Sequence, residues 1–167
     1  MITALLLAAA SPAVPDWSGH WEGTLINFPE RGGAPPITIS RDIGPWPTQD
    51  ATCTPFVTTY REAGVVKGVK DYKLCRGTGA DDLYIDEGAV PEGPDVRLPA
   101  RLFGDTLVSI FKYRDLLLLV STQTAGGIMT EDIVTAKDVP AGDAVVQLNG
   151  RSLQRLELRR SEKGHAP

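Results

Sequence analysis

The sequence predicts an all-β fold, an antiparallel up-and-down β-barrel of about 8–10 strands. Short apolar segments rich in Val, Ile, Thr and aromatic residues alternate with turns that contain many of the 17 glycines and 13 prolines. No segment shows a convincing long helical period. Near the start, Trp17, Gly19, Trp21, Gly23 and Leu25 share one face of a strand. Large indole rings therefore alternate with glycines, which suits the narrowing at the closed end of a barrel.

Within this stretch, Gly19-His20-Trp21 resembles the Gly-x-Trp signature that opens the first strand of lipocalins and related calycin barrels. The resemblance implies a closed, calycin-like barrel in which an arginine of the last strand lies over the tryptophan. The candidates for that arginine are Arg151, Arg155, Arg159 and Arg160. The chain has no Thr-Asp-Tyr-like element in its middle and no amphipathic helix after the last strand. The resemblance is therefore used for the barrel and not for the ligands of lipocalins.

The length of 167 residues suits one domain with a sizeable core. Residues 1–13 are expected to form a signal peptide, since an apolar run over Met1–Ala10 precedes small residues suited to cleavage. An ordinary apolar strand or tail is the alternative for this run. Residues 14–160 are expected to form a single barrel domain, and residues 161–167 a disordered polar tail. These features predict export to a periplasmic or extracellular compartment.

Charge and hydropathy disfavour two classes of partner. The net charge of −4 and the absence of a basic stripe before Arg151 disfavour nucleic acid, because phosphate binding needs a basic surface. No segment after the first ten residues is apolar over the length that a membrane-spanning helix needs.

The two cysteines, Cys53 and Cys75, suggest a disulfide, as expected for an exported protein. A hairpin that pivots on Gly64 places them directly opposite each other, with Phe56 opposite Tyr72. A second register turns at Lys67-Gly68 and places Tyr60 opposite Cys75, which would prevent the bond. The sequence leaves both registers open.

Further strands are expected from alternation and β-favouring residues. They cover Ile37–Ser40, Thr54–Arg61, Val69–Arg76, Leu83–Asp86, Val96–Leu102, Asp105–Tyr113, Leu116–Thr122, Ile128–Ala136, Ala144–Leu148 and Arg151–Arg159. Pro99 limits its strand to an edge or a bulge, so the barrel wall is expected to be thin or open there. Asn149-Gly150 predicts a tight hairpin turn. A helix over residues 105–120 is the weighed alternative to two strands.

Two apolar features of the sequence are expected to pack against other parts of the protein or against a partner. Leu116–Val120 is apolar on both faces, whereas a barrel strand normally shows one face to water. Another segment of the chain or a second copy would cover it, so a homodimer through this strand is one expectation. Trp46, held between two prolines, is expected to plug an edge of the core.

Residues with catalytic potential are few. His20 and His165 are the only histidines, so no metal site is expected, and a catalytic triad would depend on His20. Glu131 and Asp132 are adjacent and would face opposite sides of a strand, so they cannot share a substrate. No catalytic residue and no cofactor are therefore predicted.

A barrel of this size leaves an interior that side chains fill or that holds one small molecule. The candidate lining residues are Trp17, Trp21, Tyr60, Tyr84, Arg101, Phe111 and Tyr113. Arg101, if buried, would indicate an anionic head group. The first hypothesis is an exported, non-enzymatic binding protein for a small, largely apolar ligand. The alternatives, by fold analogy alone, are a calycin-shaped interaction module such as a periplasmic protease inhibitor, and a cavity-based isomerase or cyclase.

Overall fold

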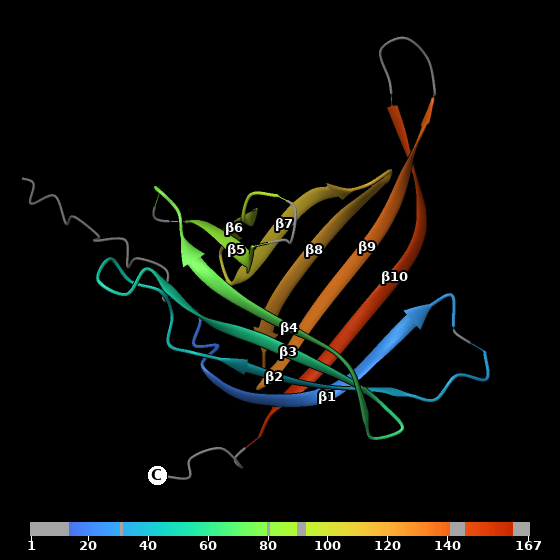
Figure 1. Ribbon diagram of the computed structural model, residues 1–167, viewed down its shortest axis with the longest axis horizontal. Helices are drawn as coiled ribbons and strands as arrows, with labels where there is room; N and C mark the ends of the chain where they lie inside the picture. Colours follow the sequence, from blue (N-terminus) through green and yellow to red (C-terminus); the bar gives the residue numbers. More distant parts are fainter. Residues whose placement is uncertain (1–13, 31, 80, 90–92, 141–145, 162–167) are drawn as a thin grey trace, which may run out of the picture.

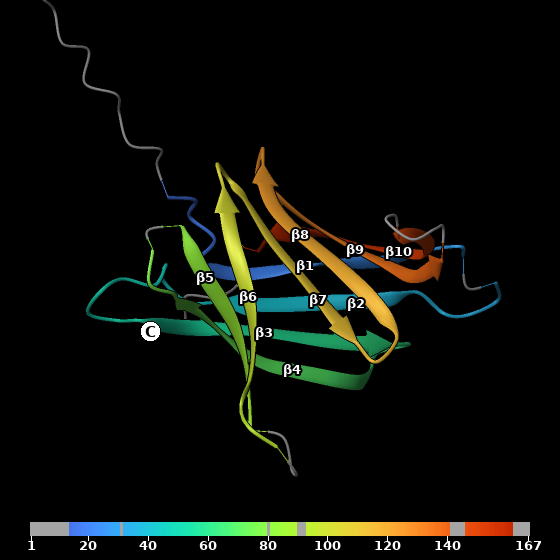
Figure 2. The same ribbon diagram turned by 90° about the horizontal axis from the view of Figure 1, so that it is seen from above.

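The computed structural model describes residues 14–30, 32–79, 81–89, 93–140 and 146–161. These residues form an all-antiparallel, up-and-down barrel in which each strand pairs with the next and the last strand returns to the first (Figures 1 and 2). The ten strands are β1 Gly19–Phe28, β2 Ile37–Ile43, β3 Cys53–Glu62, β4 Val65–Arg76, β5 Asp82–Gly88, β6 Val96–Phe103, β7 Thr106–Tyr113, β8 Leu116–Ala125, β9 Ile128–Pro140 and β10 Val146–Arg160. The predicted fold class is confirmed. The predicted signal peptide and residues 162–167 of the predicted tail lie outside the described residues.

Tryptophans and an arginine close one end of the barrel. Trp17 precedes β1, but it is buried with Trp21, and the Trp21 Nε1–H donates to the Trp17 carbonyl over 2.9 Å. Trp46 packs edge-on against Trp17 at 5.3 Å between ring centroids, as expected of a plug. The Arg160 guanidinium of β10 lies 4.8 Å from the centre of the Trp21 ring. The stacking expected from the Gly-x-Trp resemblance is therefore present, and Arg160 provides it.

Gly23 lies where the backbone of β1 packs tightly against that of β10. A Cβ at this position would lie 1.9 Å from the Glu157 carbonyl oxygen and 2.9 Å from the Leu158 Cα. Any side chain would therefore collide with backbone. This is the close approach that glycine within a strand predicts.

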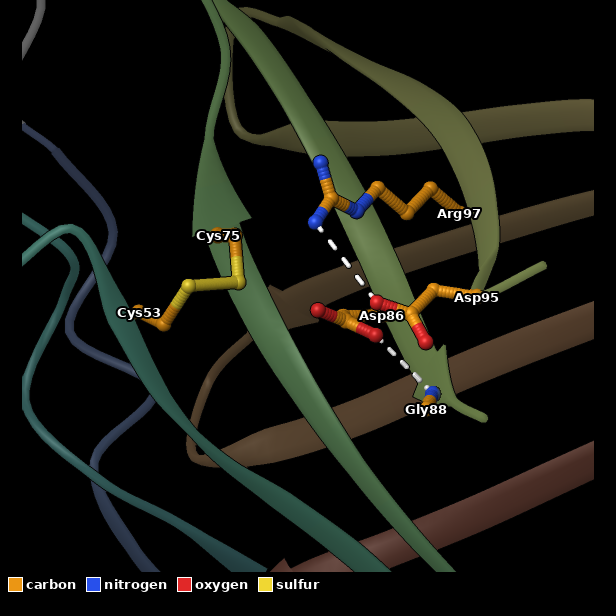
Figure 3. The surroundings of a disulfide bond; sticks show 6 residues. All are labelled: Cys53, Cys75, Asp86, Gly88, Asp95 and Arg97. Carbon is orange, nitrogen blue, oxygen red and sulfur yellow. Dashed lines mark hydrogen bonds and ion pairs between the residues drawn. A yellow bond between two sulfur atoms is a disulfide. The ribbon is translucent and has the colours of Figure 1, made fainter. Parts of the chain in front are cut away.

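The Cys53–Cys75 disulfide joins β3 to β4 (Figure 3), and the two cysteines are direct register partners. Phe56 pairs with Tyr72, so the register that pivots on Gly64 is confirmed and its competitor is wrong. The turn itself uses Ala63 and Gly64, both at positive φ. A bulge between Tyr60 and Arg61 then shifts the pairing to the register that brings the cysteines together.

Removing the disulfide with Cys53→Ser/Cys75→Ser is expected to lower the free energy of unfolding by about 3 kcal/mol, because the bond closes a loop in the unfolded chain. Denaturant unfolding monitored by circular dichroism measures the change. The wild type under reducing conditions is the matched control and should behave like the double variant. Equal stability of the oxidised wild type and the double variant would contradict a stabilising cross-link.

One expected turn was wrong, and one expected strand is longer than predicted. Asn149 and Gly150 do not turn the chain but lie within β10, opposite Lys137 and Ala136 of β9, and the register shifts directly after Gly150. Long pairing of β9 with β10 overrides the local turn preference, and glycine marks a bulge instead. The expected strand Ile37–Ser40 continues to Ile43, because the alternation of buried positions does not stop at Ser40.

The other expectations for the middle of the chain are confirmed. Residues 105–120 form strands and a turn, not a helix, with Arg114 at positive φ between β7 and β8. The β6–β7 ladder stops at Ala100 and Ser109, so Pro99 has no partner in β7. The Ser109 hydroxyl donates to the Pro99 carbonyl over 2.7 Å and ends the ladder. Backbone pairing between β6 and β7 is therefore interrupted beyond this point, as the proline predicts.

Candidate functional site

A cavity of about 90 Å³ lies in the lumen between β2 and β9. Most of its wall is apolar or aromatic, and these lining residues are Phe56, Tyr60, Tyr72, Ile85, Leu98, Leu107, Phe111, Val120 and Ile133. They reach the lumen because alternate residues of each strand point inward, as Leu107, Ser109 and Phe111 do on β7. The volume is below the roughly 150 Å³ of an apolar cavity that takes up benzene. The lumen therefore has space for a small apolar group.

A buried ion pair crosses the lumen at the inner end of the cavity. Arg41 of β2 and Glu131 of β9 are 2% and 6% exposed, and both guanidinium Nη atoms donate to the carboxylate over 2.8 and 2.9 Å. Arg41 Nε–H donates to the Thr58 hydroxyl over 2.9 Å, and the Thr122 hydroxyl donates to Glu131 over 3.0 Å. The Arg41 guanidinium also lies 4.7 Å from the centre of the Phe56 ring. Both charged groups are thus well supplied with partners.

The electrostatics of this pair keep both groups ionised. Burial opposes ionisation of Glu131, but the charge and hydrogen bonds of Arg41 outweigh it and hold the pKa of the carboxyl below its ordinary value. For Arg41, burial likewise opposes the charged form, and Glu131 reverses that effect and raises the guanidinium pKa. A carboxylate with a lowered pKa and both oxygens bonded is a poor general base. The pair therefore provides polar anchoring and not catalysis.

Polar groups also surround the outer part of the cavity. Lys70 of β4 extends over two rings, with its Nζ 5.6 Å from the centre of the Tyr60 ring and 5.8 Å from that of Tyr72. Burial raises the pKa of the Tyr72 hydroxyl, and the nearby charge of Glu87 raises it further. Lys70 is exposed, whereas Arg41 is buried, so the cavity runs from a dry inner end to an outer end in contact with solvent.

The structure brings only some of the sequence-predicted lining residues together. Tyr60 and Phe111 line the cavity. Trp17 and Trp21 are each 1% exposed and belong to the packed core at the closed end. The remaining three residues lie elsewhere.

Tyr84 alternates with the lumen-facing Leu83 and Ile85, and its ring contacts Arg97 on the outside. The Arg101 side chain is 59% exposed and pairs with Asp82 over 3.4 Å, so it is not the buried arginine that would indicate an anionic ligand. Tyr113 is 59% exposed beside the β7–β8 turn.

The sequence could have revealed Arg41 but not its partner. Ile37, Ile39, Arg41 and Ile43 fall on one face if the strand is extended past Ser40, which places Arg41 inside. Glu131 alternates in the same way with Met129 and Ile133. Two strands so far apart in sequence become facing walls only when the barrel closes, so local pattern does not pair them.

His20 lies on the outer face of β1. Its Nδ1 is 2.6 Å from Asp42 Oδ1 and its Nε2 is 3.4 Å from Glu22 Oε1. The hydrogen bond with Asp42 raises the pKa of the imidazole despite partial burial. Both ring nitrogens thus face carboxylates, and neither faces a serine as a triad would need. Within the described part of the chain, no three His, Cys, Asp or Glu side chains are grouped as metal ligands.

The outer face of β8 is apolar in the region predicted to form a homodimer. Leu119 pairs with Ile110 of β7 and Val134 of β9, and all three side chains are exposed. The homodimer through Leu116–Val120 stays a prediction. Among the described residues there is no helix with the length and apolar character to cross a bilayer.

Comparisons of the chain with protein-family models, curated proteins and solved structures gave no match. The class of protein therefore follows from its geometry alone. The chain is a closed, ten-stranded antiparallel barrel with an internal cavity, compatible with a calycin-like fold.

Proposed function

We propose that the protein is an exported, non-enzymatic binding protein that holds a small, largely apolar ligand in the lumen of its barrel. The cavity is the observation that carries this proposal, since it combines an apolar wall with a polar inner end whose charges neutralise each other. A ligand that enters needs no charge to compensate Arg41 or Glu131. Burial of its apolar part against rings such as Phe56 and Phe111 supplies the affinity.

The disulfide supports the exported location. Such bonds persist in oxidising compartments, and Cys53–Cys75 leaves no free cysteine in the described residues. Catalysis in the lumen is less well supported than binding, because Glu131 is held in its ion pair. The periplasmic protease inhibitor remains a prediction from fold analogy.

Val120→Phe is expected to weaken binding of a small apolar probe such as 1-propanol, because Val120 lines the cavity and a larger ring fills it. Leu119→Phe, on the adjacent residue that faces outward, is the matched control. Isothermal titration calorimetry should show binding by the wild type and the control, with affinities within about two-fold, and a loss of about ten-fold or more in Val120→Phe, roughly the worth of a few buried methylenes.

Circular dichroism of both variants separates lost binding from lost folding. If a panel of alcohols, carboxylates and aromatics of this size fails to bind the wild type, the proposed function is wrong. Equal loss in the two variants would place the binding outside the lumen.

A further inference from the structure

The β5–β6 hairpin pairs with its neighbouring strands only at its base. β4 pairs with β5 through the four residues Lys73–Arg76, and β6 pairs with β7 through the four residues Ala100–Phe103. Near the hairpin's tip, Asp86 accepts a hydrogen bond from the Gly88 amide and Arg97 pairs with Asp95 within the hairpin (Figure 3), while the Glu87 side chain accepts a hydrogen bond from Tyr72 of β4. The hairpin crosses the neighbouring strands at a steep angle and diverges from β4 (Figure 2).

This divergence leaves Val65–Tyr72 of β4 with a partner strand on one side only. β3 pairs along this segment, but none of the described strands pairs with its other side. Every second residue of such a segment directs its backbone N–H and C=O away from the existing partner. A closed barrel normally abolishes such edges, so an edge of this length inside one is unusual.

The edge is only partly protected against pairing. Apolar Val65, Val66 and Val69 are 58%, 50% and 56% exposed, and no proline interrupts the segment. The one bulge in this ladder lies on β4 at Lys67, which has no partner in β3, and Gly68–Tyr72 continue the edge in regular pairing with β3. An extended strand with open backbone groups and exposed valines is a template for a further strand.

The charge of β4 indicates which strand would fit. The unpaired segment Val65–Tyr72 carries Lys67 and Lys70 against the single acidic Asp71, a net charge of +1 in a chain whose total is −4. Lys67 has a long ion pair of 3.8 Å with Glu62, and its side chain is 56% exposed, so it remains accessible to another anion.

We propose that the edge Val65–Tyr72 binds an acidic polypeptide segment in extended conformation, which pairs with β4 as an added strand. Backbone hydrogen bonds would supply the affinity, and the lysines would select acidic side chains. A second copy of this chain fits less well, because antiparallel pairing centred between Gly68 and Val69 sets Lys67 of one copy against Lys70 of the other. This site lies outside the inner cavity, although Lys70 and Tyr72 of the edge also line the outer part of the cavity.

The test uses an eight-residue peptide that alternates Glu with Val. Amide hydrogen exchange by NMR should slow at every second residue of Val65–Tyr72 when the full-length protein is mixed with this peptide, and added salt should weaken binding. A peptide of equal charge with two central prolines should bind about ten-fold less well or worse, because it cannot complete the ladder. A peptide with Lys in place of Glu should not bind.

Lys67→Glu is expected to weaken binding of the acidic peptide about three- to ten-fold, the range for reversing one exposed charge contact. Lys73→Glu is the matched control, since it makes the same charge change where β4 is already paired with β5. Equal binding of the proline-containing peptide, protection outside β4, or no binding of the Glu-Val peptide would each overturn the proposal. So would concentration-dependent self-association that protects the same amides. Val120→Phe should leave peptide binding unchanged, which separates this site from the lumen.

Discussion

Glu131→Gln is expected to lower the free energy of unfolding by about 3–5 kcal/mol, the usual cost of removing one partner of a buried ion pair. Arg41 is buried and donates to both carboxylate oxygens, so the variant leaves a guanidinium charge in the lumen without an anion. Loss of one of the two oxygens that accept hydrogen bonds from Arg41 adds to the effect, because an amide has a single oxygen. Denaturant unfolding at neutral pH measures the change.

Asp132→Asn is the matched control for this prediction. Asp132 follows Glu131 on β9 and also pairs with two nitrogens of an arginine, Arg155, at 2.7 Å each. That pair lies on the outer face, with the Arg155 side chain 43% exposed. The same loss of charge should therefore cost only about 0–1 kcal/mol. Comparable losses in the two variants would contradict a special role for the buried pair.

A double variant distinguishes the net contribution of the ion pair to the free energy of unfolding from the cost of leaving one buried charge unpaired. Arg41→Met/Glu131→Leu removes both charges and fills the space with apolar groups, and such replacements are often neutral or stabilising. The double variant should therefore be more stable than Glu131→Gln by roughly 3 kcal/mol or more. If it were as unstable as the single variant, packing rather than the uncompensated charge would be the cause.

The pH dependence of this stabilisation has a definite sign. Arg41 holds the pKa of the folded-state Glu131 carboxyl below its ordinary value of 4.5. The carboxylate therefore stabilises the fold fully above the unfolded-state pKa, and this contribution is lost as the pH falls through the folded-state pKa. The difference between wild type and Glu131→Gln should be constant near neutral pH and should narrow only below about pH 4.5.

Sequence pattern predicted those parts of the fold that depend on neighbouring residues. The Trp17–Leu25 stretch indicated the closed end, Pro99 indicated where the β6–β7 ladder ends, and the Gly64 register placed Cys53 opposite Cys75. Each of these depends on alternation, a missing N–H or a tight turn, which are local properties. Asn149-Gly150 failed because pairing with β9 over a long ladder outweighs the preference of two residues for a turn.

The site was less accessible to sequence reasoning because it depends on closure of the barrel. Whether an aromatic residue faces the lumen or the outside depends on which alternate residues of its strand point inward. In β5, Ile85 points inward and Tyr84 points outward. Whether a lumen-facing residue reaches the cavity depends on its position along the barrel axis. Trp21 is too close to the closed end, whereas Phe111 lies at the height of the cavity.

Gly23→Ala is expected to destabilise the protein by about 3 kcal/mol or more, above the usual cost of overpacking, because no side chain can move to relieve the clash. The added methyl would lie 1.9 Å from the Glu157 carbonyl oxygen, so β1 and β10 would have to separate. These two strands close the barrel, and Arg160 of β10 stacks on Trp21 of β1 beside the same contact. Thermal unfolding and the near-ultraviolet circular dichroism of the tryptophans should both change.

Gly68→Ala is the matched control, since it makes the same substitution within a strand where nothing lies within 4 Å of the added Cβ. Alanine there should be neutral or slightly stabilising, because it restricts the unfolded chain more than glycine does. A comparison of the two variants separates the loss of glycine's flexibility, common to both, from the backbone contact that only Gly23 makes. If Gly23→Ala were as stable as Gly68→Ala, the barrel could close without close contact between β1 and β10, and the tryptophan-glycine alternation would not be what sets its narrow end.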